Sequence, residues 1–319
     1  MSAEFDLIRQ FFTRPALHTK LGVGDDAALV MPSAGMSLAI SADMLVADTH
    51  FFADTDPFLL GWKSLAVNLS DMAAMGAEPR WATLAIALPK VDTGWLSAFS
   101  EGFFSCAQAF NVDLIGGDTT RGPLCISVQI MGEVPLQQAL RRDAAEAGDD
   151  IWVSGCLGNA ALALNHLLGQ HPISDADLQH TLPALLKPQP RVALGLAIRE
   201  ITHACIDISD GLLADLGHIL TQSGKGAELH FERIPCSPVV QSHLDLPKVQ
   251  SMVLAGGDDY ELCFTAPTLH HDHIQCIGKQ LNLQLTCIGK VTHAKPLVLL
   301  DAQGKPMQPE KSGFDHFQS

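Results

Sequence analysis

The chain has 319 residues, of which 47% are hydrophobic and 17% charged, so it can form a core and is not a disordered protein. Its formal net charge of -15 argues against nucleic acid or an anionic membrane surface as the main partner. We find no apolar run near the roughly 18 residues of a membrane span, and no cleavable signal pattern at the amino terminus. Eight scattered cysteines without a C-x-x-C pair indicate reduced thiols, and we therefore expect a cytoplasmic protein.

The first half of the chain predicts one long helix among several strands. A strand over residues 37–42 runs into Asp43, and Asp56-Pro57 has the pattern of an N-cap followed by proline at the first helical position. The helix continues to Met75 and ends at Gly76. Further strands are expected at residues 82–88, 112–115 and 124–131.

A polar stretch between residues 135 and 150 predicts a domain boundary, which gives domains 1–138 and 139–319. The second half predicts strands at 151–154 and 204–208, a helix at 160–168 and another after the Pro-rich stretch KPQP. A last helix begins near Leu212 and ends before Gly224, with Asp210-Gly211 as a candidate N-cap. Because helices and strands alternate without a steady βαβ rhythm, we expect an α+β fold. The cluster His270-His271-x-His273 is interpreted as a solvated helix face, since nothing nearby in the sequence completes a metal site.

Aspartates recur beside glycine, serine or a strand end, where a chain presents side chains to a ligand. Any one of these segments could be a simple turn or N-cap. If several converge, however, two carboxylates about 5 Å apart repel by roughly 3 kcal/mol at an effective dielectric of about 20, so a cation is needed among them. Oxygen donors without His–Cys spacing favour Mg²⁺, which suits phosphoryl transfer. The segments contain Asp25-Asp26, Asp43, Asp71, Asp118, Asp207 with Asp210, and Asp258-Asp259.

The first of these segments, GVGDDAAL, also imitates a dinucleotide-binding loop through Gly22-x-Gly24-x-x-Ala27. We reject that interpretation because Asp25 and Asp26 would face a pyrophosphate with bare negative charge. No P-loop and no protein-kinase signature occurs elsewhere. The apolar residues 27–31 that follow are expected to be buried and to anchor the loop.

Six motifs together resemble a known family. In chain order they are GDDAA, SADMLV-x-x-x-HF, NLSDMAAMGA, LIGGDTTRG, DISDGL and GGDDYEL, and the likeness extends to the terminal SGFDHF. This set resembles the thiamine-monophosphate kinase family of the aminoimidazole ribonucleotide synthetase-like superfamily. The resemblance implies ATP-dependent phosphorylation of thiamine monophosphate to thiamine diphosphate. It also implies a two-domain α+β fold, with the N-terminal sheets of a homodimer paired and the C-terminal domain closing the active site.

The resemblance further implies roles for individual residues. The Mg²⁺ ligands would be Asp26, Ser41, Ala42, Asp43, Asp71, Asp118, Asp207 and Asp210, and among them Asp71, Asp118 and Asp210 would serve catalysis. ATP would contact Gly117, Asp118, Arg142 and Ser209, and thiamine monophosphate would contact His50, Asp258 and Phe314. Asp25 would only shape its turn.

Two positions depart from the family pattern. Ala42 stands where threonine is frequent, so a metal contact there must come from the backbone carbonyl. Asp258 stands where glutamate is common, which shortens its reach toward the substrate. Bland interpretations remain open for others: Arg142 as a solvated charge, His50 as a structural histidine, Phe314 as a cover for an apolar edge, and Asn68 as either an orienting group for Asp71 or a partner within its own helix.

Two alternative functions also remain open. One is another ATP-using enzyme of the same superfamily that acts on a different small molecule. The other is a non-catalytic protein that binds nucleotide or metal through the acidic cluster.

Overall fold

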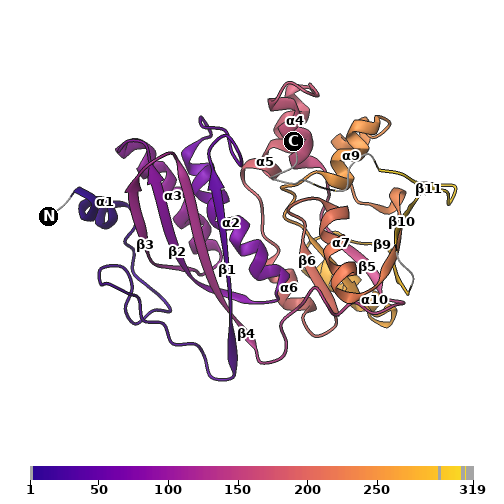
Figure 1. Ribbon diagram of the computed structural model, residues 1–319, viewed down its shortest axis with the longest axis horizontal. Coiled ribbons are helices and arrows are strands. Elements are labelled where there is room, and N and C mark those ends of the chain that lie inside the picture. Colours follow the sequence, from indigo (N-terminus) through magenta and orange to yellow (C-terminus); the bar gives the residue numbers. More distant parts are fainter. Residues whose placement is uncertain (1–2, 294–295, 310–312, 314–319) are drawn as a thin grey trace. The chain divides into compact units, whose positions relative to one another are not determined.

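The computed structural model describes residues 3–293, 296–309 and 313 (Figure 1). Contacts divide the chain into two compact units, residues 1–72 with 77–137 and residues 73–76 with 138–319. The domains expected from the sequence, residues 1–138 and 139–319, stay a prediction, because they describe which part of the chain carries which function. In the described part of the chain, no helix combines the length and the apolar character that crossing a membrane requires.

The first unit is built on a four-stranded sheet in the order β1-β4-β2-β3, in which only the β2–β3 pair is parallel. Its elements are α1 (Ala3–Phe11), β1 (Met36–Val46), α2 (Pro57–Ala74), β2 (Glu78–Leu88), α3 (Thr93–Ala109), β3 (Asp113–Arg121) and β4 (Cys125–Pro135).

The long predicted helix is present as α2. The carboxylate of Asp56 accepts a hydrogen bond from the backbone N–H of Leu59 at 3.0 Å, which satisfies one of the unpaired donors at the helix start. Apolar side chains recur along this helix at spacings of three and four, among them Leu65, Leu69 and Met72, and these three are buried. This helix therefore follows from its local signals and its 3.6-residue period.

Strand β3 is longer than predicted, because Gly116 to Arg121 continue the strand and pair in parallel with β2. Gly117 accounts for the difference. Its φ is +150°, and a Cβ at this position would lie 1.8 Å from the carbonyl oxygen of Leu84. The glycine thus allows two strands to approach closely, where the sequence pattern suggested the start of a turn.

Strand β1 is an edge strand with two different faces. One face carries Ser41 and Asp43, which hydrogen-bond to residues of α2. The other face carries exposed apolar side chains, of which Ile40 and Met44 are 58% and 56% exposed. Alternation along the strand thus separates a polar row directed at α2 from an apolar row that this chain leaves uncovered.

The second unit contains a seven-stranded mixed sheet in the order β11-β10-β7-β9-β5-β8-β6. Its strands are β5 (Asp150–Ser154), β6 (Ala204–Asp207), β7 (Gly226–His230), β8 (Leu262–Ala266), β9 (Leu285–Thr292), β10 (Leu297–Leu300) and β11 (Pro306–Met307). Its helices are α4 (Asn159–Leu167), α5 (Asp175–Leu186), α6 (Val192–Ile198), α7 (Leu212–Ser223), α8 (Pro238–His243), α9 (Pro247–Ala255) and α10 (His271–Gln280), with short 3-10 turns η1 (Phe231–Arg233) and η2 (Thr268–His270).

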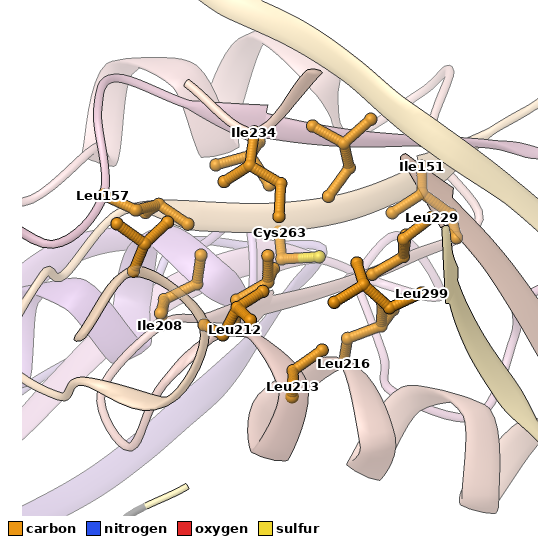
Figure 2. Packing of buried hydrophobic residues seen from close by; sticks show 14 of the residues in the cluster. Ile151, Leu157, Ile208, Leu212, Leu213, Leu216, Leu229, Ile234, Cys263 and Leu299 are labelled. Atoms are coloured by element: carbon orange, nitrogen blue, oxygen red, sulfur yellow. The ribbon is translucent and has the colours of Figure 1, made fainter. Parts of the chain in front are cut away.

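The core of the second unit lies between the sheet and its helices. Figure 2 shows Ile151 of β5, Cys263 of β8 and Leu229 of β7 packed with Leu212 and Leu216 of α7. The cysteine acts here as an apolar side chain. Helix α5, which contains Pro183, was not predicted. The two units, each with a sheet and helices, confirm the α+β class.

Candidate functional site

In the first unit, Ser41 and Asp71 are in direct contact. The hydroxyl of Ser41 donates to the carboxylate of Asp71 at 2.5 Å, across the interface between β1 and α2. Two predicted metal ligands, 30 residues apart in sequence, therefore share one place in this unit. Ala42 lies between Ser41 and Asp43 on the opposite face of β1 and is exposed, so only its backbone carbonyl could serve as a ligand.

Asn68 holds the neighbouring part of β1. Its side-chain oxygen accepts the backbone N–H of Asp43 at 3.1 Å, and its amide donates to the carbonyl of Ser64 within α2 at 3.1 Å. The side chain is fully buried. Asn68 thus fixes the backbone of Asp43, a role that the sequence interpretation, which considered Asp71 or the helix itself, only half anticipated.

His50 follows a tight turn after β1. Asp48, with a φ of +63°, turns the chain, and the backbone N–H of Val46 donates to Nδ1 of His50 at 3.0 Å. Because Nδ1 is an acceptor here, the neutral ring carries its proton on Nε2. This tautomer can donate a hydrogen bond to a phosphate oxygen.

The glycine loop GVGDDAAL near the amino terminus and strand β3 line a common cavity of about 520 Å³. This volume is typical of small-molecule sites. Asp25, Asp26, Gly117 and Asp118 belong to its lining, over apolar side chains that include Leu84. The structure therefore brings a predicted metal ligand of the loop, Asp26, to the same cavity as the predicted ligand Asp118.

Asp25 and Asp26 have different positions in this loop. Asp25 accepts the backbone N–H of Asp26 at 2.9 Å, as we expect of a residue that shapes the turn. The expectation that residues 27–31 are buried was wrong, since Leu29 and Met31 are 60% and 62% exposed. Two isolated bridges, Leu21 with Leu29 and Val23 with Asp25, join the loop to itself, and within the described part of the chain Leu29 and Met31 stay largely open to solvent.

The dinucleotide-loop interpretation is excluded by the local fold. The glycine loop does not connect a strand to a helix, because the next element along the chain is β1. A dinucleotide loop needs the N-terminus of a helix directly after its glycines to receive the pyrophosphate.

In the second unit, a carboxylate that the sequence interpretation missed organises the DISDG loop. Asp215 of α7 is 3% exposed, and one of its oxygens accepts the backbone N–H groups of Ser209, Asp210 and Gly211 at 3.0, 3.0 and 3.1 Å. Burial raises the pKa of Asp215 to about 7, against the opposing effect of the backbone donors. The signal was present in the sequence as an acidic residue in the first turn of a helix that otherwise reads as apolar.

Asp210 is not the N-cap of α7, contrary to the candidate drawn from the sequence. The helix begins after Gly211, whose φ is +114°, and no side chain caps it in the usual way. Asp215 reaches back to the start of the helix instead. The side chain of Asp210 therefore stays available for another role, and Asp207 lies at the end of the neighbouring strand β6.

Backbone hydrogen bonds join the GGDDYEL segment, residues 256–262, to the neighbouring DISDG loop, residues 207–211. Asp258 donates its N–H to the carbonyl of Ser209 at 2.9 Å, and Tyr260 donates to Ile208 at 2.8 Å. Both Asp258 and Tyr260 have positive φ, and the Tyr260 hydroxyl donates to the carboxylate of Asp258 at 2.9 Å. The structure thus brings Ser209 and Asp258 together in one double loop.

The neighbouring acids of this segment have structural partners. Asp259 accepts the N–H of Gly158, at the start of α4, at 3.0 Å, and removal from solvent raises its pKa well above the usual range. Glu261 is paired with Arg191 and accepts a hydrogen bond from Ser154. Asp259 therefore holds the start of α4, while Asp258 accepts the hydroxyl of Tyr260.

The structure gives no ligand-like contact to Arg142 among its described residues. Arg142 is exposed, whereas its neighbour Arg141 is engaged by Asp143 through two hydrogen bonds of 2.8 and 2.5 Å. Phe314 lies outside the described residues.

The predicted ligands do not by themselves form a closed metal cage. Within the described part of either unit, no three of the predicted carboxylates offer ligand atoms within 4.8 Å of one another. The magnesium ligand set therefore stays a prediction, supported by the pairs that the structure does bring together.

Comparisons with known proteins assign the family. The N-terminal domain of AIR synthase related protein matches residues 24–134, and the C-terminal domain of AIR synthase related protein matches residues 146–301. Thiamine-monophosphate kinase of Salmonella typhimurium is 43% identical over 318 residues, which covers 98% of each chain.

Solved structures agree with this assignment. The crystal structure of thiamine-monophosphate kinase from Stenotrophomonas maltophilia is 45% identical, covers 92% of this chain and 94% of that one, and superposes with a TM-score of 0.84. AaThiL complexed with AMPPCP and TMP is 28% identical, covers 98% of this chain and 96% of that one, and has a TM-score of 0.77. The chain therefore belongs to the AIR synthase related family and, within it, to the thiamine-monophosphate kinase family.

Proposed function

We propose that this enzyme transfers the γ-phosphoryl group of ATP to thiamine monophosphate and so forms thiamine diphosphate. The observation that carries the proposal is the cavity of the first unit, where Asp26 and Asp118 stand over a glycine-rich strand and loop. The relative solved with AMPPCP and TMP supports the same pair of substrates for this chain.

The donor set fits a hard divalent cation. The side chains of Asp26, Ser41, Asp43, Asp71 and Asp118 in the first unit, and of Asp207 and Asp210 in the second, offer only oxygen atoms, as Mg²⁺ prefers. Bound Mg²⁺ would neutralise the charge of the phosphates and leave coordination positions open to their oxygens. Before the ion binds, the hydrogen bond from the Ser41 hydroxyl keeps the Asp71 carboxylate oriented.

The remaining residues position the two anions. We assign Gly117, Arg142 and Ser209 to ATP, with the glycine allowing close backbone approach and the arginine offering a fork of donors to phosphate. We assign His50 and Asp258 to thiamine monophosphate. His50, protonated on Nε2 in its neutral form, would donate to the substrate phosphate without requiring a change of charge.

No strong general base is required by this chemistry. The acceptor is a phosphate monoester that is already largely ionised near neutral pH, so the difficulty lies in bringing two anions into line. The protein then catalyses the reaction by positioning the two substrates and compensating their negative charge. Asp71, Asp118 and Asp210 contribute by fixing the position of the Mg²⁺ charge.

A single assay tests the function. Purified protein should release ADP from ATP in a Mg²⁺-dependent reaction with thiamine monophosphate, and not with thiamine. Turnover with thiamine monophosphate at background level by well-folded protein would contradict the proposal. Turnover with a different acceptor would favour another enzyme of the superfamily, and binding of ATP without turnover would favour a non-catalytic protein.

We also propose that the chain acts as a homodimer that pairs the open faces of its N-terminal sheets. The support is the apolar row of β1, Met36, Leu38, Ile40 and Met44, on an edge strand of 11 residues. Replacement Ile40→Lys should shift the sedimentation coefficient from dimer to monomer, whereas Val91→Lys, at an exposed apolar residue of a loop, should not. A wild-type protein that sediments as a monomer would contradict the dimer.

The predicted cytoplasmic location is supported by eight cysteines that are all free.

A further inference from the structure

A second group of metal-binding side chains lies in the second unit, at the end of the sheet opposite to the DISDG loop. Asp150 of β5, His271 of α10 and Cys287 of β9 each offer one ligand atom, and these atoms lie within 4.8 Å of one another. His271 belongs to the histidine cluster for which the sequence suggested no partners. The fold supplies two, 121 and 16 residues away.

An irregularity in the sheet puts Cys287 on this face. Asp150 pairs with Lys290, and Ile151 with Gly289, but Trp152 pairs with Cys287, so one residue of β9 is skipped. Ile288, the skipped residue, is buried in the core. Without this bulge Cys287 would stand opposite Val153 and face the core; with it, the thiol lies on the same face as Asp150.

The first residue of α10 completes the group. Nδ1 of His271 lies 3.3 Å from a carboxylate oxygen of Asp150, and its ring packs on Trp152 with centroids 4.7 Å apart. Asp150 is 4% exposed, whereas His271 is 44% exposed, so solvent reaches the group from the helix side. A buried carboxylate, a half-exposed imidazole and a half-buried thiol thus meet at a place that an ion can enter.

We propose that Asp150, His271 and Cys287 form a binding site for a borderline transition-metal ion of the Zn²⁺ class. One oxygen, one nitrogen and one sulfur donor together suit such an ion, whereas Mg²⁺ and Ca²⁺ avoid nitrogen and sulfur. Tetrahedral bonds of about 2.0 to 2.3 Å require donor atoms about 3.3 to 3.8 Å apart, so small side-chain rotations are enough to close the set. Water would take the fourth position.

Lys290 would compete with a metal ion for the carboxylate of Asp150. Its ammonium lies 2.6 Å from the Asp150 carboxylate and also contacts the hydroxyl of Thr268. Burial, and then the charge of Asp150, raise the pKa of the Cys287 thiol, while Lys290 and Arg233 oppose this. Binding of the ion would therefore displace the ammonium from Asp150, and the Cys287 thiol would lose its proton to solvent.

The bound ion would tie α10 to the sheet. Asp150 and Cys287 belong to adjacent strands, and His271 begins the helix that lies over them. Metal binding is then linked to the folding of the second unit, so that the ion stabilises the native state.

Cobalt titration of the metal-free, full-length protein tests the site. With excess Mg²⁺ present and no nucleotide, Co²⁺ should produce a thiolate-to-cobalt charge-transfer absorption in the near ultraviolet. The oxygen-only ligands proposed for phosphoryl transfer cannot give this band. Replacements Cys287→Ser and His271→Gln should each weaken Co²⁺ binding at least about tenfold, and Cys287→Ser should abolish the band. The matched controls Cys276→Ser and His273→Gln, on the same helix, should leave both unchanged.

Two further measurements keep the test independent of folding defects. Lys290→Met retains all three ligands and should bind Co²⁺ more tightly than wild type. Zn²⁺ should raise the thermal midpoint of wild type and not that of Cys287→Ser. The proposal is overturned if wild type shows no charge-transfer band, if the band persists in Cys287→Ser, or if Lys290→Met binds no more tightly.

Discussion

Replacement of Asp215 tests how the second unit holds the DISDG loop, residues 207–211. In Asp215→Ala, the backbone N–H groups of Ser209, Asp210 and Gly211 lose a shared acceptor. A buried donor without a partner costs about 1–3 kcal/mol, so three would cost about 3–9 kcal/mol. Ser209 and Asp210 are only half-buried and water can replace part of the loss, so we expect the free energy of unfolding to fall by about 3–5 kcal/mol.

Asp215→Asn keeps an oxygen acceptor in the same place and removes the charge, so we expect a loss of only about 1–2 kcal/mol. Urea unfolding followed by circular dichroism measures both variants, with Asp272→Ala, at an exposed aspartate in the first turn of α10, as the control. Because the loop also carries Asp210 and Ser209, Mg²⁺-dependent ADP release by Asp215→Ala should fall about 100-fold. An alanine variant with the urea midpoint and the turnover of wild type would refute the reasoning.

The other predictions concern the first unit. Asp71→Asn should keep the fold and the contact with Ser41, yet lose turnover by about 100-fold or more; unchanged ADP release would show that the acidic cluster is not the metal site. Gly117→Ala places a methyl group 1.8 Å from the carbonyl oxygen of Leu84, so we expect ATP binding measured by calorimetry to be lost and stability to fall by about 1–3 kcal/mol; normal binding would contradict this. For Glu133, burial raises the pKa, but the hydrogen bonds from Ser33 and the charge of Arg80 outweigh burial, and the folded-state pKa lies below 4.5. Its contribution to stability is therefore present above pH 4.5 and lost as the pH falls through the lower folded value. Glu133→Gln should be about 1–3 kcal/mol less stable than wild type at pH 7, and a gap in urea midpoint that does not narrow below pH 4.5 would exclude this origin.

Local signals were sufficient for several features of the site. The Asp56-Pro57 start and the apolar period of α2 depend on neighbours within one or two turns, and both were found from the sequence. The family assignment rested on six short motifs and is confirmed by relatives that match nearly the whole chain. The contact of Asp25 with its own turn is also local, since its carboxylate accepts the backbone N–H of the next residue.

Features that depend on contacts between distant segments could not be derived from the sequence. The strand character of Gly116 to Arg121 depends on pairing with β2, and Leu29 and Met31 are exposed because no described part of the chain packs over them. The N-cap assigned to Asp210 failed because Asp215 competes for the same backbone groups from inside the helix.

The sequence by itself therefore determined the family, through its six motifs, and the long helix α2, through its start signal and apolar period. The tertiary structure decided which of these residues meet. Ser41 reaches Asp71 only because β1 lies against α2, and His271 reaches Asp150 and Cys287 only because a bulge turns one residue of β9 to the face that α10 covers. Side-chain period and turn chemistry act over a few residues, whereas pairing across a sheet is set by packing of the whole unit.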